Sequence, residues 1–412
     1  MPIDVIGLRR AIFAAFVVGL GLSITLSESA LALLTLLWLW RLRDPAVRAT
    51  ARLPLWRPVL AFSALSLASA LASGYPGTSL VASKGLLLVA ALYVTVDALP
   101  GPEAAHRFLA ALAVMAAIAA VVGLLQVGLC PGPEPDYGSR AWLYHRCFRA
   151  RGFFSIYMTL AGVLNLVLLA TLPLLLPGKA LTRWLIPPWA LTLAGLIATD
   201  TRGAWIGFIS GALALLPMTR RGRWLLIGSL LVLGLSATLG PQHLRQRFLS
   251  IGDPEDRTVK ERVYMWRSGL AMWQTSPWLG VGPGGVKREY RRFALPEAIK
   301  KRTGHVHNTP LQILVERGVI GLAAWLWIWG AFYAGTVRLL RRLPGAAGQE
   351  RALVAGSLAA ITGFLVAGLT EYNFGDSEVV MVAWTIMAVP FVVGSRVPLG
   401  PDLGRRQIDE PL

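Results

Sequence analysis

The sequence predicts an all-α polytopic membrane protein with about twelve transmembrane helices, on the strength of its composition and hydrophobic patterning. Of the 412 residues, 55% are hydrophobic, and the mean hydropathy is +0.57. Only 15% are charged, whereas about a quarter of the residues in an ordinary soluble domain are charged. Apolar runs near the roughly 20 residues needed to cross a bilayer recur along the chain. The composition therefore excludes an ordinary soluble domain.

The apolar runs follow one another with mostly short polar connections. Their expected ranges are 8–26, 29–40, 58–73, 80–99, 108–129, 153–176, 184–198, 203–217, 224–239, 309–337, 352–369 and 379–393. Pro173, Pro177, Pro187 and Pro188 fall in or beside the sixth and seventh runs. Proline removes a backbone donor and kinks a helix, so we expect these two spans to be the least regular.

Basic clusters between the runs indicate the orientation, because short loops rich in Lys and Arg stay in the cytoplasm. With an even number of spans, both chain ends and all of these clusters are cytoplasmic. The clusters are Arg41, Arg43, Arg48, Arg52 and Arg57, then Lys179 and Arg183, then Arg220, Arg221 and Arg223, then Arg338, Arg341, Arg342 and Arg351. Polar regions 130–152, 200–202 and 242–308 then face the opposite, external side.

This orientation divides the chain into five parts. We expect N-terminal transmembrane helices in 1–129 and an external loop in 130–152. Central transmembrane helices follow in 153–241. A large external loop with short helices and the candidate catalytic motif occupies 242–308. The C-terminal transmembrane helices and a cytoplasmic tail fill 309–412.

The formal net charge is +18, which in a soluble protein would suggest nucleic acid. Here the basic residues lie between apolar runs, so anionic lipid headgroups and phosphates are the expected partners and nucleic acid is not. The external loop 242–308 carries thirteen basic and six acidic residues. Long loops translocate largely regardless of charge, but an anionic substrate on this side would account for the excess.

The two cysteines, Cys130 and Cys147, share the first external loop. Outside the cytoplasm they can form a disulfide, since that environment is oxidising. Two unpaired thiols are the alternative, and the sequence leaves both open.

Arginines recur in all three external regions. Solvation, headgroup binding or snorkelling to the interface accounts for any single one of them. Arg151 is expected to begin the sixth span, where a cation opposes the helix macrodipole unless an anion is bound. The full candidate set is Arg146, Arg149 and Arg151 in the first region, Arg202 in the second, and Arg262 and Arg267 in the third.

The segment His305-Val306-His307-Asn308 places two imidazoles just before the tenth apolar run. A neutral histidine takes up a proton near neutral pH, so a general base is one interpretation. A metal pair is disfavoured, because no cysteine or carboxylate lies within a few residues. A purely structural role at the helix start is the remaining alternative. Glu316, farther along, can orient an imidazole or pair with an arginine.

The glycine-rich run GVGPGG precedes this segment. It lacks the lysine-serine continuation of a phosphate loop, so we interpret it as a tight turn at the membrane surface.

Four motifs together resemble a known family. They are RGFF after the first external loop, TRGAWIG, ERVYMWRSGLAMWQTSPWLGVGPGG and HNTPLQILVERGVIG. In this order they resemble the O-antigen ligase and polymerase superfamily of bacterial envelope enzymes. The resemblance covers residues 149–321, and the span count extends it to the whole chain. Where the family's first motif often continues with proline or asparagine, this chain has Ser155-Ile156-Tyr157.

The resemblance implies a metal-independent, inverting glycosyltransferase of the GT-C-like membrane type, without a cofactor. The implied donor is a polysaccharide on undecaprenyl diphosphate, and ligase members transfer it to the lipid A core. The implied site faces the periplasm from the bacterial inner membrane. His307 is the implied base, with Asn308 beside it and His305 and Glu316 as secondary residues. The implied diphosphate ligands, in place of a metal, are Arg202, Arg262 and Arg267 with Arg146, Arg149 and Arg151.

Three other functions remain open at this point. An O-antigen polymerase would extend the glycan on its carrier, and a protein O-oligosaccharyltransferase would attach it to a protein hydroxyl. A transporter for lipid-linked sugars is the third alternative and is not an enzyme. Charged residues near the bilayer midplane would favour it.

Overall fold

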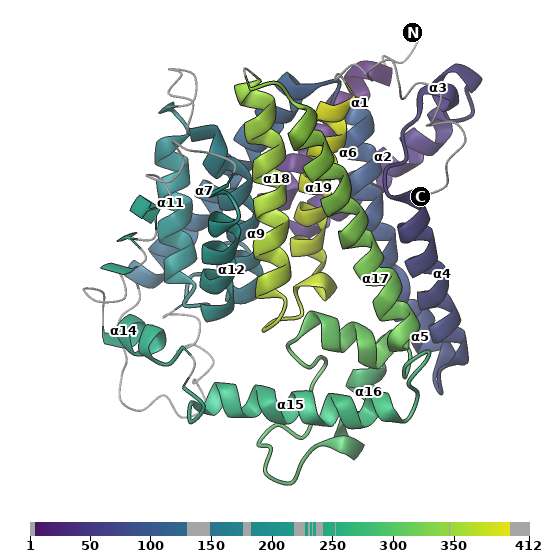
Figure 1. Cartoon of the computed structure of the whole chain (residues 1–412), viewed down its shortest axis with the longest axis vertical. Helices are drawn as coiled ribbons and strands as arrows, with labels where there is room; N and C mark the ends of the chain where they lie inside the picture. Colours follow the sequence, from purple (N-terminus) through teal and green to yellow (C-terminus); the bar gives the residue numbers. More distant parts are fainter. Residues whose placement is uncertain are drawn as a thin grey trace.

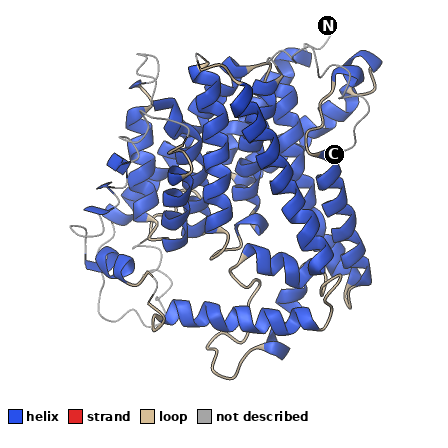
Figure 2. Cartoon of the chain, in the orientation of Figure 1, coloured by secondary structure: helices blue, strands red, loops and turns tan. Residues whose placement is uncertain are grey.

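The computed structural model describes residues 5–129, 149–175, 183–217, 227–229, 231–232, 234–235, 242–251, 253–345 and 347–395. The described residues are 78% helix and contain no strand. Figure 2 shows helices throughout, joined by loops. The predicted all-α polytopic fold is confirmed.

Among the described residues, eight helices or helix runs are long and apolar enough to cross a membrane. They are α1 (Val5–Leu22), α2 (Ile24–Arg41), α5 to α6 (Pro76–Ala98), α7 (Pro102–Gly128), α9 with η3 (Tyr157–Leu175), α17 (Thr309–Arg342), α18 (Gly348–Ala367) and α19 (Ser377–Gly394). Two shorter apolar helices are α4 (Trp56–Ala72) and α11 (Ile186–Ala198). The ninth expected span, 224–239, lies largely outside the described residues, and the total of about twelve stays a prediction.

The run Pro76–Ala98 consists of α5 (Pro76–Ala82), η1 (Ser83–Val89) and α6 (Ala90–Ala98), and the run Tyr157–Leu175 of α9 (Tyr157–Thr171) and η3 (Leu172–Leu175). Further elements are α3 (Pro45–Thr50), α12 (Arg202–Leu213), α14 (Gln242–Leu249), α15 (Arg257–Gln274), α16 (Gly285–Phe293) and η4 (Asn373–Gly375).

The centre of the bundle is formed by α9, α18 and α19. Helix α18 packs against α9, α12 and α19, and α7 packs against α1, α9 and α11. The most buried residues are apolar side chains on these helices, such as Leu164, Phe208 and Ile361, none of them exposed. Close packing of these side chains between the helices stabilises the bundle on which the polar loops rest.

At one end of the bundle, α15 lies across the upright helices with α16 beside it (Figure 1). Asp256 caps α15, its carboxylate accepting from the N–H groups of Thr258 at 2.9 Å and Val259 at 3.1 Å. A separate small core joins α15, α16 and the start of α17 through Met265, Met272, Val286, Tyr290, Val306 and Val315. This end is called the loop face below.

Helix α17 is interrupted, which corrects the expectation of one continuous span over 309–337. Gly318 has φ 65° and ψ −172°, so two helical segments, 309–317 and 319–342, meet there (Figure 1). The Val319 N–H donates to the Pro277 carbonyl at 2.9 Å instead of to Val315, whose carbonyl accepts from Val281 at 2.9 Å. Pro277 and the glycine-rich run that follows it thus provide partners for the backbone groups that the break in the helix leaves unpaired.

Helix α9 begins at Tyr157, which corrects a second expectation. Arg151 lies six residues earlier in a turn and does not begin the helix. The macrodipole argument for a bound anion at Arg151 therefore fails, because that effect is confined to the first turn of a helix.

Candidate active site

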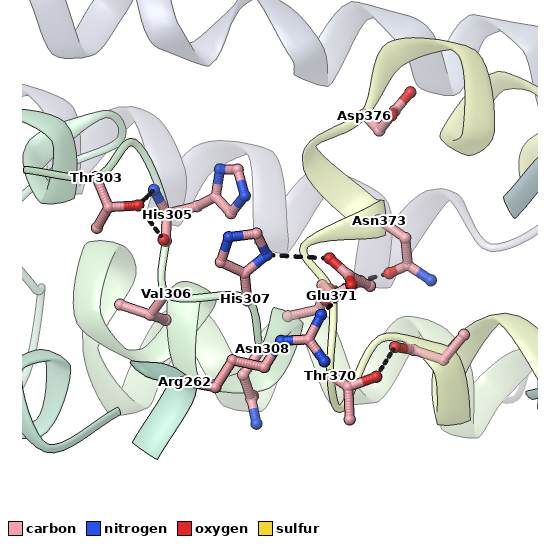
Figure 3. A network of polar contacts seen from close by, with 12 residues as sticks. Arg262, Thr303, His305, Val306, His307, Asn308, Thr370, Glu371, Asn373 and Asp376 are labelled. Carbon is pink, nitrogen blue, oxygen red and sulfur yellow. Dashed lines mark hydrogen bonds and ion pairs between the residues drawn. The ribbon is translucent and has the colours of Figure 1, made fainter. Parts of the chain in front are cut away.

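The centre of the candidate site is a contact between His307 and Glu371. The Nδ1 of His307 lies 3.0 Å from Oε2 of Glu371, and their side chains are 14% and 13% exposed. Glu371 belongs to the short turn between α18 and α19. Figure 3 shows the rings of both histidines directed from their loop toward this turn. With Nδ1 held by a carboxylate, the other nitrogen, Nε2, is the one free to exchange protons with a substrate.

The histidine loop is fixed on both sides of His307. The buried Val306 N–H donates to the side chain of Gln312 at 2.9 Å. Asn308 caps α17 by accepting from the Leu311 N–H at 2.9 Å, and its Nδ2 donates to the Leu369 carbonyl at 2.9 Å. His307 itself has φ 50°, an uncommon backbone conformation for a residue with a side chain. The surrounding contacts maintain this strained conformation, as is common at functional sites.

Glu371 joins the site to α15. Its second carboxylate oxygen forms an ion pair with Arg262. Burial alone would raise the pKa of Glu371, but the hydrogen bond from His307 and the charge of Arg262 hold that pKa below its usual value. The carboxylate is therefore ionised at neutral pH, between a guanidinium and an imidazole.

Sequence reasoning did not identify Glu371. The sequence did contain one indication of its location, because the turn 370–376 lies between the eleventh and twelfth apolar runs. The alternation that places 242–308 on the external side places this turn there as well. An acidic residue in a short turn is nevertheless ordinary, and only the fold brings it to His307.

His305 lies against His307, with ring centroids 4.3 Å apart, and 5.8 Å from the ring of Tyr372. Burial, followed by the charge of His307, lowers the pKa of His305 to about 4. His305 is therefore neutral at neutral pH, and it forms part of the wall of a cavity.

That cavity has a volume of about 180 Å³ and brings together four segments of the chain. Its wall includes Thr159 at the start of α9, Thr201 before α12, His305, and both Glu371 and Asp376 in the α18–α19 turn. The Thr159 hydroxyl donates to Asp376 at 2.5 Å. The sequence predicted only that these segments lie on the same side of the membrane, and the structure brings them together around one cavity.

The arginines of the expected diphosphate site fall in different surroundings. Arg149 forms an ion pair with Asp200 at 3.3 Å and lies over the Tyr157 ring at 4.2 Å from its centroid. Arg267 is exposed on α15. Arg146 lies outside the described residues, as do both cysteines.

Arg202 is buried and holds the start of α15. Its guanidinium donates to Asp256 at 3.0 Å and to both the carbonyl and the hydroxyl of Ser250 at 2.8 Å. Burial would raise the pKa of Asp256, but the hydrogen bond from Arg202 leaves it below its usual value. The cap of α15, and with it the position of Arg262, therefore depends on Arg202.

Glu316 does not orient an imidazole and instead pairs with an arginine, the second of its two expected roles. Its carboxylate accepts from Arg317 at 3.1 Å, from Gln312 at 2.8 Å and from the Gly284 N–H at 2.9 Å. Gly284 has φ 74°, a left-handed conformation that glycine adopts readily. The glycine run is thus the tight turn that the sequence predicted, held against α17.

One comparison with known proteins identifies a family. Residues 189–326 match the family model described as O-antigen ligase. A search of curated proteins found no match. The matched segment contains Arg202, Arg262, the glycine run and His307, whereas Glu371 lies beyond it. Over residues 189–326, this match bears out the predicted resemblance to the O-antigen ligase superfamily.

Proposed function

We propose that this protein is an O-antigen ligase that transfers a polysaccharide from undecaprenyl diphosphate to the lipid A core oligosaccharide. The observation that carries the proposal is the His307–Glu371–Arg262 arrangement on the loop face of a family member. It combines a base, a carboxylate that orients it and a cation, which are the groups that such a transfer requires.

His307 acts as the general base. Its Nε2 takes the proton of an acceptor sugar hydroxyl as the oxygen bonds to the anomeric carbon of the donor, and the bond from that carbon to the lipid diphosphate breaks. Direct displacement inverts the anomeric centre. Glu371 accepts from Nδ1 and stabilises the imidazolium that forms, in the way an aspartate supports the histidine of a serine protease.

The arginines stabilise the negative charge that develops on the leaving diphosphate. Arg149, Arg202 and Arg262 each pair with a carboxylate in the structure. A guanidinium has five N–H donors, so Arg149 and Arg262 keep donors for phosphate oxygens, and Arg202, which also donates twice to Ser250, keeps fewer. We assign Arg262 and Arg267 on α15 to the diphosphate together with Arg146, Arg149, Arg151 and Arg202. In this scheme arginines take the role that a divalent cation has in many glycosyltransferases, and no metal is required.

The proposed setting is the bacterial inner membrane with the loop face in the periplasm. The basic clusters in 41–57 and 338–351, at the other end of the bundle (Figure 1), support it, since short basic loops remain cytoplasmic. Both substrates carry lipid chains and reach the site from the bilayer.

A reconstitution assay tests the proposal. Purified protein in liposomes receives a defined undecaprenyl-diphosphate-linked glycan, with lipid A core, a second donor molecule or an acceptor protein offered in turn. We expect glycosylated lipid A core, with inverted anomeric configuration by NMR, in the presence of EDTA. Extension of the carrier-linked glycan would instead identify a polymerase, and a glycosylated protein an oligosaccharyltransferase. Movement of the donor across the bilayer without any covalent product would indicate a transporter.

A further inference from the structure

A second cavity, of about 530 Å³, lies at the end of the bundle opposite to α15. Helices α2, α6 and α19 end there, and α3 lies beside it (Figure 1). The cavity contacts none of the residues assigned to transfer. It is therefore separate from the proposed transfer site.

The polar part of the lining is basic. Arg41 and Arg52 contribute guanidiniums, and Asp97 contributes the single carboxylate. The same oxygen of Asp97 accepts from Arg41 at 2.7 Å and from Arg9 at 2.9 Å. Arg52 is exposed and forms no ion pair with another described residue. One carboxylate neutralises only one of these three arginines.

The ends of α2, α6 and α19 add partial negative charge, roughly half a unit at each helix C-terminus. This charge favours nearby arginines but does not outweigh three guanidiniums against one carboxylate. The hydroxyls of Thr50 and Ser395 already donate to helix carbonyls. An anion in the cavity would therefore be bound by the guanidiniums, with geometry suited to phosphate oxygens.

The rest of the wall is apolar. Trp38, Leu99 and Phe391 line it, and the Trp38 indole is stacked on Tyr93 with ring centroids 5.9 Å apart. A free phosphate ion would leave these side chains without a partner. A ligand with a phosphate at one end and a hydrocarbon chain at the other matches both parts of the wall.

We propose that this cavity binds the headgroup of an anionic phospholipid, with Arg41 and Arg52 donating to the phosphate and Trp38 and Phe391 packing against the first carbons of the acyl chains. Basic pockets between transmembrane helices are known to select anionic lipid headgroups. Because this end of the bundle is predicted to be cytoplasmic, the ligand is a lipid of the cytoplasmic leaflet. The proposal is independent of the transfer reaction.

Native mass spectrometry of the full-length protein in detergent tests it. Phosphatidylglycerol and phosphatidylcholine with identical acyl chains are titrated in parallel, and we expect tighter binding of phosphatidylglycerol. Arg52→Gln, which breaks no ion pair among the described residues, should weaken that binding about fivefold. Arg41→Gln should weaken it at least as much. Arg43→Gln is the matched control, because Arg43 is an exposed arginine of the same loop outside the cavity lining.

Three results would overturn the proposal. The first is equal binding by wild type and Arg52→Gln. The second is displacement of phosphatidylglycerol by equimolar inorganic phosphate, which would identify a site for soluble anions. The third is a large gain in lipid binding after truncation behind Ser395, which would assign the cavity to the acidic residues of 396–412. Unchanged melting temperatures show that each variant is folded.

Discussion

Two largely buried glutamate–arginine pairs of the loop face differ in what surrounds them. Glu316 and Arg317 have side chains 4% and 8% exposed, and Ser66 also accepts from Arg317. Glu371 and Arg262 are 13% and 18% exposed, and the second oxygen of Glu371 faces His307. Both pairs border a cavity, Arg317 one of about 110 Å³ and Glu371 the one of about 180 Å³, but only the second pair contacts a histidine.

This difference indicates that the Glu316–Arg317 pair stabilises the fold and that the Glu371–Arg262 pair belongs to the candidate active site. Glu316 accepts the Gly284 N–H, and its backbone carbonyl accepts from Gly282 at 3.0 Å and from Ser69 at 2.8 Å. It thereby joins α4, the glycine run and the interrupted α17. The carboxylate of Glu371 instead contacts Arg262 and His307, the two groups that the proposed transfer uses. Four substitutions on the loop face test this assignment, and they follow from the largest expected effect to the smallest.

His307→Ala should reduce transfer about 10⁴-fold, the upper range for loss of a general base. The side chain is 14% exposed and belongs to neither apolar core, so the melting temperature in detergent should stay near that of wild type. The assay is product formation from the defined donor in liposomes. Transfer at the wild-type rate would remove His307 from the mechanism.

Glu316→Gln should act on stability instead. It leaves Arg317 buried without its carboxylate, which costs about 3–5 kcal/mol. We expect a lower melting temperature and less folded protein, with near-normal transfer per folded molecule. A variant that melts like wild type but fails in transfer would reverse the assignment of the two pairs.

Glu371→Gln should reduce transfer about 10²-fold, because a neutral amide keeps the shape but cannot stabilise the imidazolium. At 1.36 kcal/mol per tenfold in rate, this is about 2.7 kcal/mol. Glu255→Gln, at a glutamate whose side chain is 78% exposed, is the matched control. Equal transfer by the two variants would contradict the proposed role of Glu371.

His305→Asn should change only the response to acid. The pKa of His305 falls from 6.5 to about 4 on folding, so the unfolded chain binds a proton between these values that the folded protein does not. The stability from this residue is complete above pH 6.5 and is lost as the pH falls toward 4. Thermal melts across this range should show a smaller loss in the variant than in wild type. An identical loss in both would show that His305 does not titrate in this way.

The sequence predicted the helical membrane fold and the family, since hydrophobic run length and basic clusters are local signals. The number of expected spans also predicted that His307 and Arg262 lie on the same side of the membrane. The sequence could not predict the break at Gly318, because the bonds that stabilise it come from Pro277 and Val281, about forty residues away. The roles of Arg202 and Glu371 could not be predicted for the same reason. Their partners are distant in the sequence and are brought to them only by the packing of the helices.

The central claim is that His307 and Glu371 act as one unit. A double-mutant cycle of transfer rates, with His307→Ala, Glu371→Gln and the combination in liposomes, measures this directly. If Glu371 works through the imidazole, the double variant should be no slower than His307→Ala alone. Losses that multiply, about 10²-fold beyond the single histidine variant, would show that the two residues act separately and would contradict the account.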